Sequence, residues 1–255
     1  FPTRRLLAQS LVIPIRSLRV VKPRIGGGFG GKRHIHVEPF VALVALATKR
    51  SARIALTRKW VFESTFTRHR MRIDIEAGAN RNGVLNVMDV RVLSDTGAYG
   101  EHALTVFMVA GSKTLPLYNK MKAVGYGGAV VYTNHLSAGA FRGYGAIQGN
   151  FALESMMDEI AHEIHMDPIE FRERNMIREG QTSEVFKIMG EGSEGVEMVI
   201  ESCKLDRCIA RGRELIGWDP KRLSWEVSPG IVRAHGMAIA MRSEERRVGK
   251  ECRSR

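Results

Sequence analysis

Cysteine is scarce in this sequence, and its spacing excludes several classes of protein. The 255 residues include three cysteines, Cys203, Cys208 and Cys252, and no two of them form a C-x-x-C pair. Three thiols cannot build a disulfide scaffold or a zinc ribbon, and they fall short of the four thiolates that usually hold an iron–sulfur cluster. We therefore expect a reducing compartment and a cytoplasmic location.

Long apolar runs and a signal peptide are also missing. No segment reaches the roughly 20 apolar residues that a membrane-spanning helix needs, so we expect no membrane partner. The chain opens FPTRRLLAQSLVIPI, without an initiator Met or a small-residue cleavage site. We expect it to begin within a longer protein and to be truncated at both ends.

Acidic residues are outnumbered by basic ones, and the formal net charge is +12. This balance raises one alternative, a basic nucleotide- or nucleic-acid-binding module without catalysis. The cations are spread along the chain, however, and are not interleaved with aromatic residues as base stacking requires. We therefore favour a diffuse basic surface and expect no nucleic-acid partner.

The last fourteen residues, 242–255 (RSEERRVGKECRSR), differ from the rest of the chain. They contribute +3 of the net charge, lack apolar periodicity and follow abruptly after a strand-like run that ends at Met241. They resemble the in-frame translation of a sequencing adapter. We expect them to be a non-native tail and exclude them from the fold.

The period of the apolar residues changes along the chain, which indicates an α+β fold of mixed sheets and packed helices. Alternation on either side of Asn-Arg-Asn-Gly at 80–83 predicts a β-hairpin. A 3.6-residue period predicts helices over 149–178, with Asp167 as N-cap and Pro168 at the first helical position of the second. Shorter patterns predict helices at 5–13, 36–48 and 195–205, and strands at 17–25, 52–58 and 230–241.

The glycine-rich segment GGGFGGK, residues 26–32, satisfies two nucleotide-binding patterns but meets the full requirements of neither. A dinucleotide site needs an acidic residue about 20 positions later, and residues 46–59 contain none. A phosphate loop needs Ser or Thr where Arg33 stands. What remains is a loop whose bare backbone amides can approach an anionic or oxo ligand, or a turn needed only for packing.

A second glycine-rich segment, SAGAFRGYGAIQ at 137–148, precedes the long amphipathic helix. Together with GGGFGGK, ALESMMDEIA and MDPIEFRERNMI, it resembles the molybdenum-binding large subunit of the xanthine dehydrogenase/aldehyde oxidase family, over about residues 3–241. The resemblance implies a first molybdopterin-binding domain over residues 1–180. Residues 181–241 would form a linker and the start of a second such domain.

The resemblance also implies an activity and its cofactors. Such an enzyme hydroxylates an electron-poor carbon of a purine or another N-heterocycle with water as the oxygen source; an aldehyde-oxidising relative is the alternative. The cofactor would be molybdenum–molybdopterin, in the plain or the cytosine dinucleotide form. Iron–sulfur clusters and FAD would lie on partner domains or subunits, and the substrate would be a small heterocycle or aldehyde.

Site residues follow from the resemblance position by position. The expected cofactor-binding residues lie on the two glycine loops: Gly28, Phe29, Gly30, Gly31, Arg142 and Gly143. The backbones of Phe29 and Arg142 would lie near molybdenum, with no side chain as a metal ligand.

The same resemblance suggests two substrate-binding residues. Tyr144 would pack against the substrate. Arg33 stands where purine-hydroxylating members often carry Glu or Gln, and it suits a substrate with a carboxylate or several carbonyls. That departure argues against xanthine itself.

No catalytic residue is expected within the chain, because the family's base glutamate would lie beyond its C-terminus. His34 and His36 alternate as neighbours on a strand would. With no third metal ligand beside them in the sequence, we interpret them as surface residues.

Overall fold

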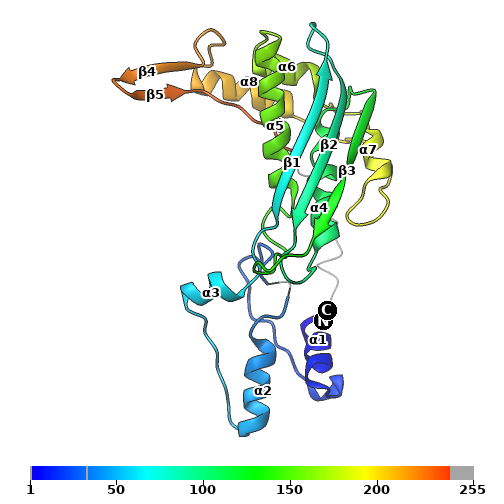
Figure 1. Ribbon diagram of the computed structural model, residues 1–255, viewed down its shortest axis with the longest axis vertical. Helices are drawn as coiled ribbons and strands as arrows, with labels where there is room; N and C mark the ends of the chain where they lie inside the picture. Colours follow the sequence, from blue (N-terminus) through cyan, green and yellow to red (C-terminus); the bar gives the residue numbers. More distant parts are fainter. Residues whose placement is uncertain (1, 33, 242–255) are drawn as a thin grey trace. The chain divides into compact units, whose positions relative to one another are not determined.

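The computed structural model describes residues 2–32 and 34–241 and contains two compact units (Figure 1). The first unit consists of the described residues up to Arg70 together with Ser94–Ala103 and Val130–Tyr144. The second consists of Met71–Leu93, Leu104–Ala129 and the described residues from Gly145 onward. Each unit is assembled from segments that are distant in the sequence. The expected non-native tail and Arg33 lie outside the described residues, and the domain boundary at 180/181 stays a prediction.

The first unit contains short helices joined by long loops. Its regular elements are α1 (Pro2–Leu11), η1 (Ile15–Ser17), α2 (Glu38–Thr48) and α3 (Arg58–Ser64). The helices predicted at 5–13 and 36–48 are confirmed as α1 and α2. The strands predicted at 17–25 and 52–58 are wrong: β-branched residues favour extended backbone there, but neither segment forms a ladder with another described segment. Thr57 instead caps α3, accepting a hydrogen bond from Trp60 N at 3.2 Å.

The second unit is built on a three-stranded sheet. Its strands are β1 (Arg70–Ala79), β2 (Leu85–Asp95) and β3 (Ala123–Val131), in the order β1-β2-β3. The predicted hairpin is confirmed at the β1–β2 turn, where Gly83 has φ +73° and donates its N–H to Asn80 O at 2.9 Å. Side chains of β2 alternate between buried and more exposed positions along most of the strand, so one face of the sheet is available for packing.

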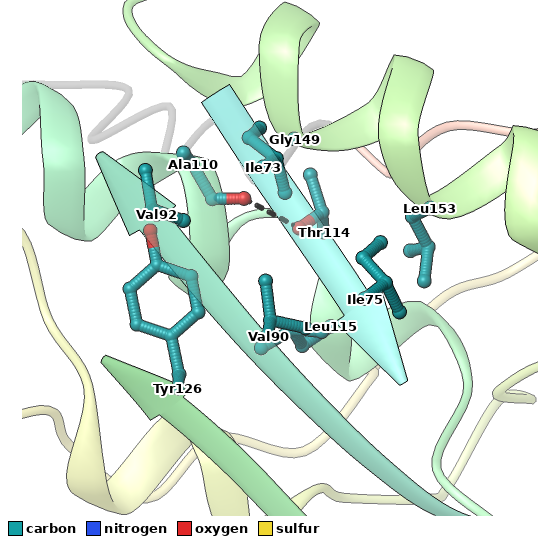
Figure 2. Close-up of a pocket in the computed structure, with 10 residues that line it drawn as sticks. All are labelled: Ile73, Ile75, Val90, Val92, Ala110, Thr114, Leu115, Tyr126, Gly149 and Leu153. Carbon is teal, nitrogen blue, oxygen red and sulfur yellow. Dashed lines mark hydrogen bonds between the residues drawn. The ribbon is translucent and has the colours of Figure 1, made fainter. Parts of the chain in front are cut away.

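Two helices pack against that face, α4 (Ala103–Ser112) and α5 (Ala146–Glu163). Figure 2 shows the resulting core, to which the sheet contributes Ile73, Ile75, Val90, Val92 and Tyr126. The remaining cavity of ≈ 10 Å³ can hold a single water at most, so it is packed core rather than a ligand site. The two helices can approach closely because Gly149 has no side chain. A Cβ at that position would overlap the carbonyl oxygen of Ala110.

A buried carboxylate ties distant segments of the second unit together. Glu154, on α5, accepts hydrogen bonds from the Tyr118 hydroxyl at 2.6 Å, Arg172 Nε at 2.8 Å and Ile239 N at 2.8 Å. Arg172 is fully buried and also contacts Asp158 Oδ1 at 2.6 Å. Burial and the adjacent Glu154 charge raise the pKa of Tyr118 well above its usual value, so the phenol stays protonated and donates.

The second unit also contains the 3-10 helix η2 (Leu115–Leu117), which precedes β3, and short elements that follow α5: α6 (Pro168–Asn175), α7 (Glu184–Ile188), α8 (Leu205–Ile216), β4 (Ser224–Ser228) and β5 (Ile231–Ala234). The predicted cap of α6 is confirmed, since Asp167 accepts from Ile169 N at 3.1 Å. The helix predicted at 195–205 is wrong. That segment is extended and bridges Thr182 through Val199, as its β-branched residues favour.

Strand β5 confirms part of the strand predicted at 230–241 and pairs antiparallel with β4. Among the described residues, no helix combines the length and apolar character needed to cross a bilayer.

Candidate functional site

The glycine loop at 26–32 is an irregular turn in the first unit, held closed by its own lysine. Lys32 Nζ donates to Gly27 O at 2.7 Å. Phe29 and Gly30 both have positive φ, at 50° and 92°. Phe29 is 66% exposed, so the described residues do not bury its large apolar ring. The loop therefore presents an aromatic side chain and a strained backbone, features that occur at ligand sites.

The second glycine loop packs directly against the first. A Cβ on Gly30 would overlap the carbonyl oxygen of Ala140 and come within 2.9 Å of Phe141 Cα. Both contacts are with backbone, which cannot move aside as the end of a side chain could. The Arg142 guanidinium lies 5.3 Å from the Phe29 ring centroid, a cation–π contact between the loops. The structure thus brings together two segments about 110 positions apart in the sequence.

Other glycines of the first loop have no such structural requirement. A Cβ on Gly26 or Gly28 would meet nothing within 4 Å, and on Gly31 only Gly28 O at 4.0 Å. Since none of the three has a positive φ, neither conformation nor packing among the described residues requires glycine there. Exposed main chain without side chains suits a bound group that lies against the backbone, so the residues present fit a molybdopterin-type cofactor.

A buried donor lies in the same unit, beside the second loop. The Arg68 guanidinium is 4.6 Å from the Phe141 ring centroid, and its Nη1 is buried without a hydrogen-bond partner among the described residues. Burial lowers the pKa of Arg68, yet a guanidinium stays charged at neutral pH. An anionic or carbonyl-bearing ligand would satisfy this donor.

Tyr144 ends the second loop, and its hydroxyl contacts a histidine cluster. Its backbone has φ 49°, and its hydroxyl is hydrogen-bonded to His102 Nδ1. On the other side of the His102 ring, Nε2 lies 2.5 Å from Nε2 of His34. His34 Nδ1 in turn lies 3.4 Å from a Glu101 carboxylate oxygen. Four polar side chains from three segments therefore form a continuous series within the first unit.

The turn that carries Glu101 and His102 is fixed by Asp95. Burial opposes ionisation of Asp95, but hydrogen bonds from Thr133 Oγ1, Gly97 N and His135 outweigh it and hold the pKa of Asp95 at about 2. The carboxylate is therefore charged at neutral pH. At Gly97, φ is +70° and a Cβ would overlap the carbonyl oxygen of Leu136, so the turn requires glycine.

Most of the residues predicted for the site lie on the two loops that meet: Gly28, Phe29, Gly30, Gly31, Arg142, Gly143 and Tyr144. Their roles stay predictions. Arg33 lies outside the described residues. The interpretation of His34 and His36 as surface residues fails for His34, whose side chain is 16% exposed and contacts Glu101 and His102. Those partners come 67 and 68 residues later, in GEH after SDTGAY, and nothing in the spacing connects them to His34.

Known proteins are similar to this chain over most of its length. The family described as "Molybdopterin cofactor-binding domain" matches residues 1–176. A xanthine dehydrogenase molybdenum-binding subunit of Escherichia coli O157:H7 is 37% identical over 238 residues, which cover 93% of this chain and 30% of that protein. The chain thus spans about a third of that relative's length.

The fold of this chain is also similar to that of solved structures. An aldehyde oxidoreductase from Desulfovibrio gigas superposes with a TM-score of 0.71 at 30% identity, covering 83% of this chain and 22% of that one. Quinoline 2-oxidoreductase from Pseudomonas putida 86 also gives 0.71, at 25% identity, covering 84% and 27%. The mixed helix-and-sheet fold predicted from the sequence is confirmed by these similarities.

Proposed function

This chain belongs to the molybdopterin-binding family of the xanthine dehydrogenases and aldehyde oxidoreductases, and from that premise we propose that it forms part of a molybdenum hydroxylase. The proposed reaction oxidises an electron-poor carbon of a purine or another N-heterocycle, with water as the source of oxygen. The E. coli relative is described as a xanthine dehydrogenase subunit and the P. putida structure as a quinoline oxidoreductase. Both names support a heterocyclic substrate.

One observation carries the assignment of the cofactor site. Gly30 fixes the first loop against Ala140, while the Cα atoms of Gly26 and Gly28 face open space. A rigid contact beside exposed main chain makes a preorganised surface of amides. We assign Gly28, Phe29, Gly30 and Gly31, with Arg142 and Gly143 of the second loop, to cofactor binding.

When bound, the molybdenum–molybdopterin group supplies the two-electron redox chemistry. The chain's own residues position the reactants. The Phe29 and Arg142 backbones would face the metal, and no side chain of the two loops would be its ligand. Tyr144 would pack its ring on the substrate, since the bond from its hydroxyl to His102 fixes the direction of that ring. The cofactor-loaded site would thereby hold a planar substrate in one orientation.

Electron transfer away from the site would require other domains or subunits. The sequence has three cysteines, fewer than an iron–sulfur cluster needs. We propose that partner domains or subunits carry iron–sulfur clusters and FAD and accept the electrons. A cytoplasmic enzyme fits such reduced cofactors.

Substrate class is tested on the complete protein that carries this chain, with its cofactors and partners. We expect one molybdenum per chain by inductively coupled plasma mass spectrometry, and turnover of at least one N-heterocycle when hypoxanthine, xanthine and nicotinate are each supplied, with oxygen from labelled water. Turnover restricted to an aromatic aldehyde would instead favour the aldehyde-oxidising alternative, which the D. gigas structure's name supports. A molybdenum-free protein that binds DNA would refute the enzyme and favour the basic binding module.

Arg33 provides a second test of substrate choice. A guanidinium pairs with carboxylates or paired carbonyls, so Arg33→Gln should change the order of kcat/KM among these substrates. Arg24→Gln, which removes a cation from the exposed segment before the glycine loop, is the matched control and should leave the order unchanged. An unaltered order for Arg33→Gln would count against its role in substrate binding.

A further inference from the structure

Three side chains of residue types that ligate metals gather in the first unit. His34 follows the glycine loop, and Glu101 and His102 follow the turn at Gly97. One ligand atom from each of the three lies within 4.8 Å of the other two. All three side chains are half-buried, so the cluster is neither a solvated surface group nor a sealed core.

The two imidazole rings face each other through their Nε2 atoms. The Tyr144 hydroxyl is hydrogen-bonded to Nδ1 of His102, which directs the opposite nitrogen, Nε2, toward Nε2 of His34 at 2.5 Å. Two ring nitrogens cannot face each other with lone pairs alone, because those lone pairs repel. A proton or a metal cation must lie between them.

The arrangement matches the way proteins hold metal-ligating histidines. A ligating imidazole commonly has its second nitrogen fixed by an outer hydrogen bond, and Tyr144 provides that bond for His102. The His34 ring is fixed by an edge-to-face contact with Phe66, with centroids 5.1 Å apart. Both rings are therefore positioned by groups that would remain in place when their Nε2 atoms bind a cation.

Two imidazoles and one carboxylate form a ligand set typical of a zinc site with an open fourth position. Zinc at about 2.0–2.1 Å from each nitrogen holds two such ligands about 3.3 Å apart. Zinc binding would therefore require the distance between the two Nε2 atoms to increase by less than about 1 Å. The Glu101 side chain is 42% exposed, so the cluster is accessible from solvent.

We propose that His34, Glu101 and His102 bind one divalent transition-metal ion, with zinc as the representative, separate from the molybdopterin group. Tyr144 acts as a positioning residue for this site. The site does not depend on the proposed hydroxylase activity, because its ligands are all side chains of the first unit. An ion there would fix the hydroxyl end of Tyr144 and so restrict the ring of the residue assigned to the substrate.

Zinc binding is measured on the complete protein, washed with a chelator and dialysed against ZnCl2. We expect one zinc per chain by mass spectrometry, in addition to any molybdenum determined in the same sample. His34→Gln and His102→Gln should lower zinc affinity by more than the 10- to 100-fold that is typical for loss of an outer partner, and Tyr144→Phe by about that amount. His36→Gln, on the same segment and in contact with Phe66, is the matched control and should bind as the unaltered protein does.

The absorption spectrum of bound Co²⁺ tests whether Glu101 is a metal ligand, because a residue with only a structural role would not change that spectrum. Co²⁺ in the unaltered protein should give visible absorption bands of a four-coordinate site, and Glu101→Gln should change them; the Glu101 side chain is partly exposed, so this variant should fold. Zinc content no higher than in the triple variant H34Q/E101Q/H102Q would overturn the proposal and favour a shared proton between the rings. Because zinc and molybdenum are measured separately in the same sample, absence of zinc binding can be distinguished from absence of the molybdenum on which the proposed hydroxylase depends.

Discussion

Alanine replacements at two glycines of the first loop, Gly28 and Gly30, should have opposite consequences. At Gly30, φ is +92° and the new methyl group would overlap the Ala140 backbone, so the two loops would have to separate. A residue forced into such a conformation costs of the order of 1–3 kcal/mol. At Gly28 the methyl would meet nothing within 4 Å, and the stiffer unfolded chain should stabilise the protein by about 0.4–1 kcal/mol.

Hydrogen exchange and molybdenum content separate the two effects. Gly30→Ala should lower protection of amides in both loops by about 5- to 150-fold, which corresponds to 1–3 kcal/mol. Gly28→Ala should keep protection of the cofactor-free protein at or above the original level, yet lower molybdenum content, because its methyl group would occupy the space assigned to the cofactor. The comparison is made on the complete protein.

Gly212→Ala is the control, because that glycine in α8 also has open space around its Cα. It should stabilise the protein by up to about 1 kcal/mol, as Gly-to-Ala changes in helices do, and leave molybdenum content unchanged. Full molybdenum loading of Gly28→Ala would refute the assignment of this loop to the cofactor. Unchanged protection in Gly30→Ala would refute the packing argument.

Three further changes test other parts of the structure. Glu154→Gln should lower the unfolding free energy by about 3–5 kcal/mol in denaturant titrations, because it leaves buried Arg172 without its main counter-charge; a loss below 1 kcal/mol would contradict this. Asp95 has a folded pKa of about 2, below its usual 3.8, so it stabilises the fold above pH 4 and this contribution is lost as pH falls toward 2; Asp95→Asn should abolish that part of the acid dependence of Tm. Tyr144→Phe keeps the ring but loses the bond to His102, so it should raise KM for a planar substrate less than Tyr144→Leu does, and equal KM values for the two variants would argue against ring packing.

Local sequence patterns predicted much of the fold, but they did not predict the cluster of His34, Glu101 and His102. The hairpin around Asn80 and Gly83 and the cap at Asp167 depend on residues within a few positions, and both are confirmed. The strands predicted at 17–25 and 52–58 are wrong because strand formation depends on a pairing partner that local composition does not specify.

In the candidate site, too, local features were predicted and contacts between distant segments were not. Both glycine loops were identified from their own residues, whereas the contact of Gly30 with Ala140 depends on folding across about 110 positions. His34 and His102 lie in contact although they are 68 positions apart in the sequence. Contacts of this kind have no local pattern, so the sequence identified the loops as separate segments and left the histidine cluster unrecognised.

The hydrogen bonds to Glu154 also have a consequence for the order of folding during synthesis. Tyr118 precedes Glu154 by 36 residues, Arg172 follows by 18 and Ile239 by 85. A ribosome that has made α5 and α6 can supply the first two donors, but the backbone N–H of Ile239 emerges last. Since each long-range contact requires closure of a loop, the core of the second unit becomes complete only when the strand-like segment at its C-terminal end docks.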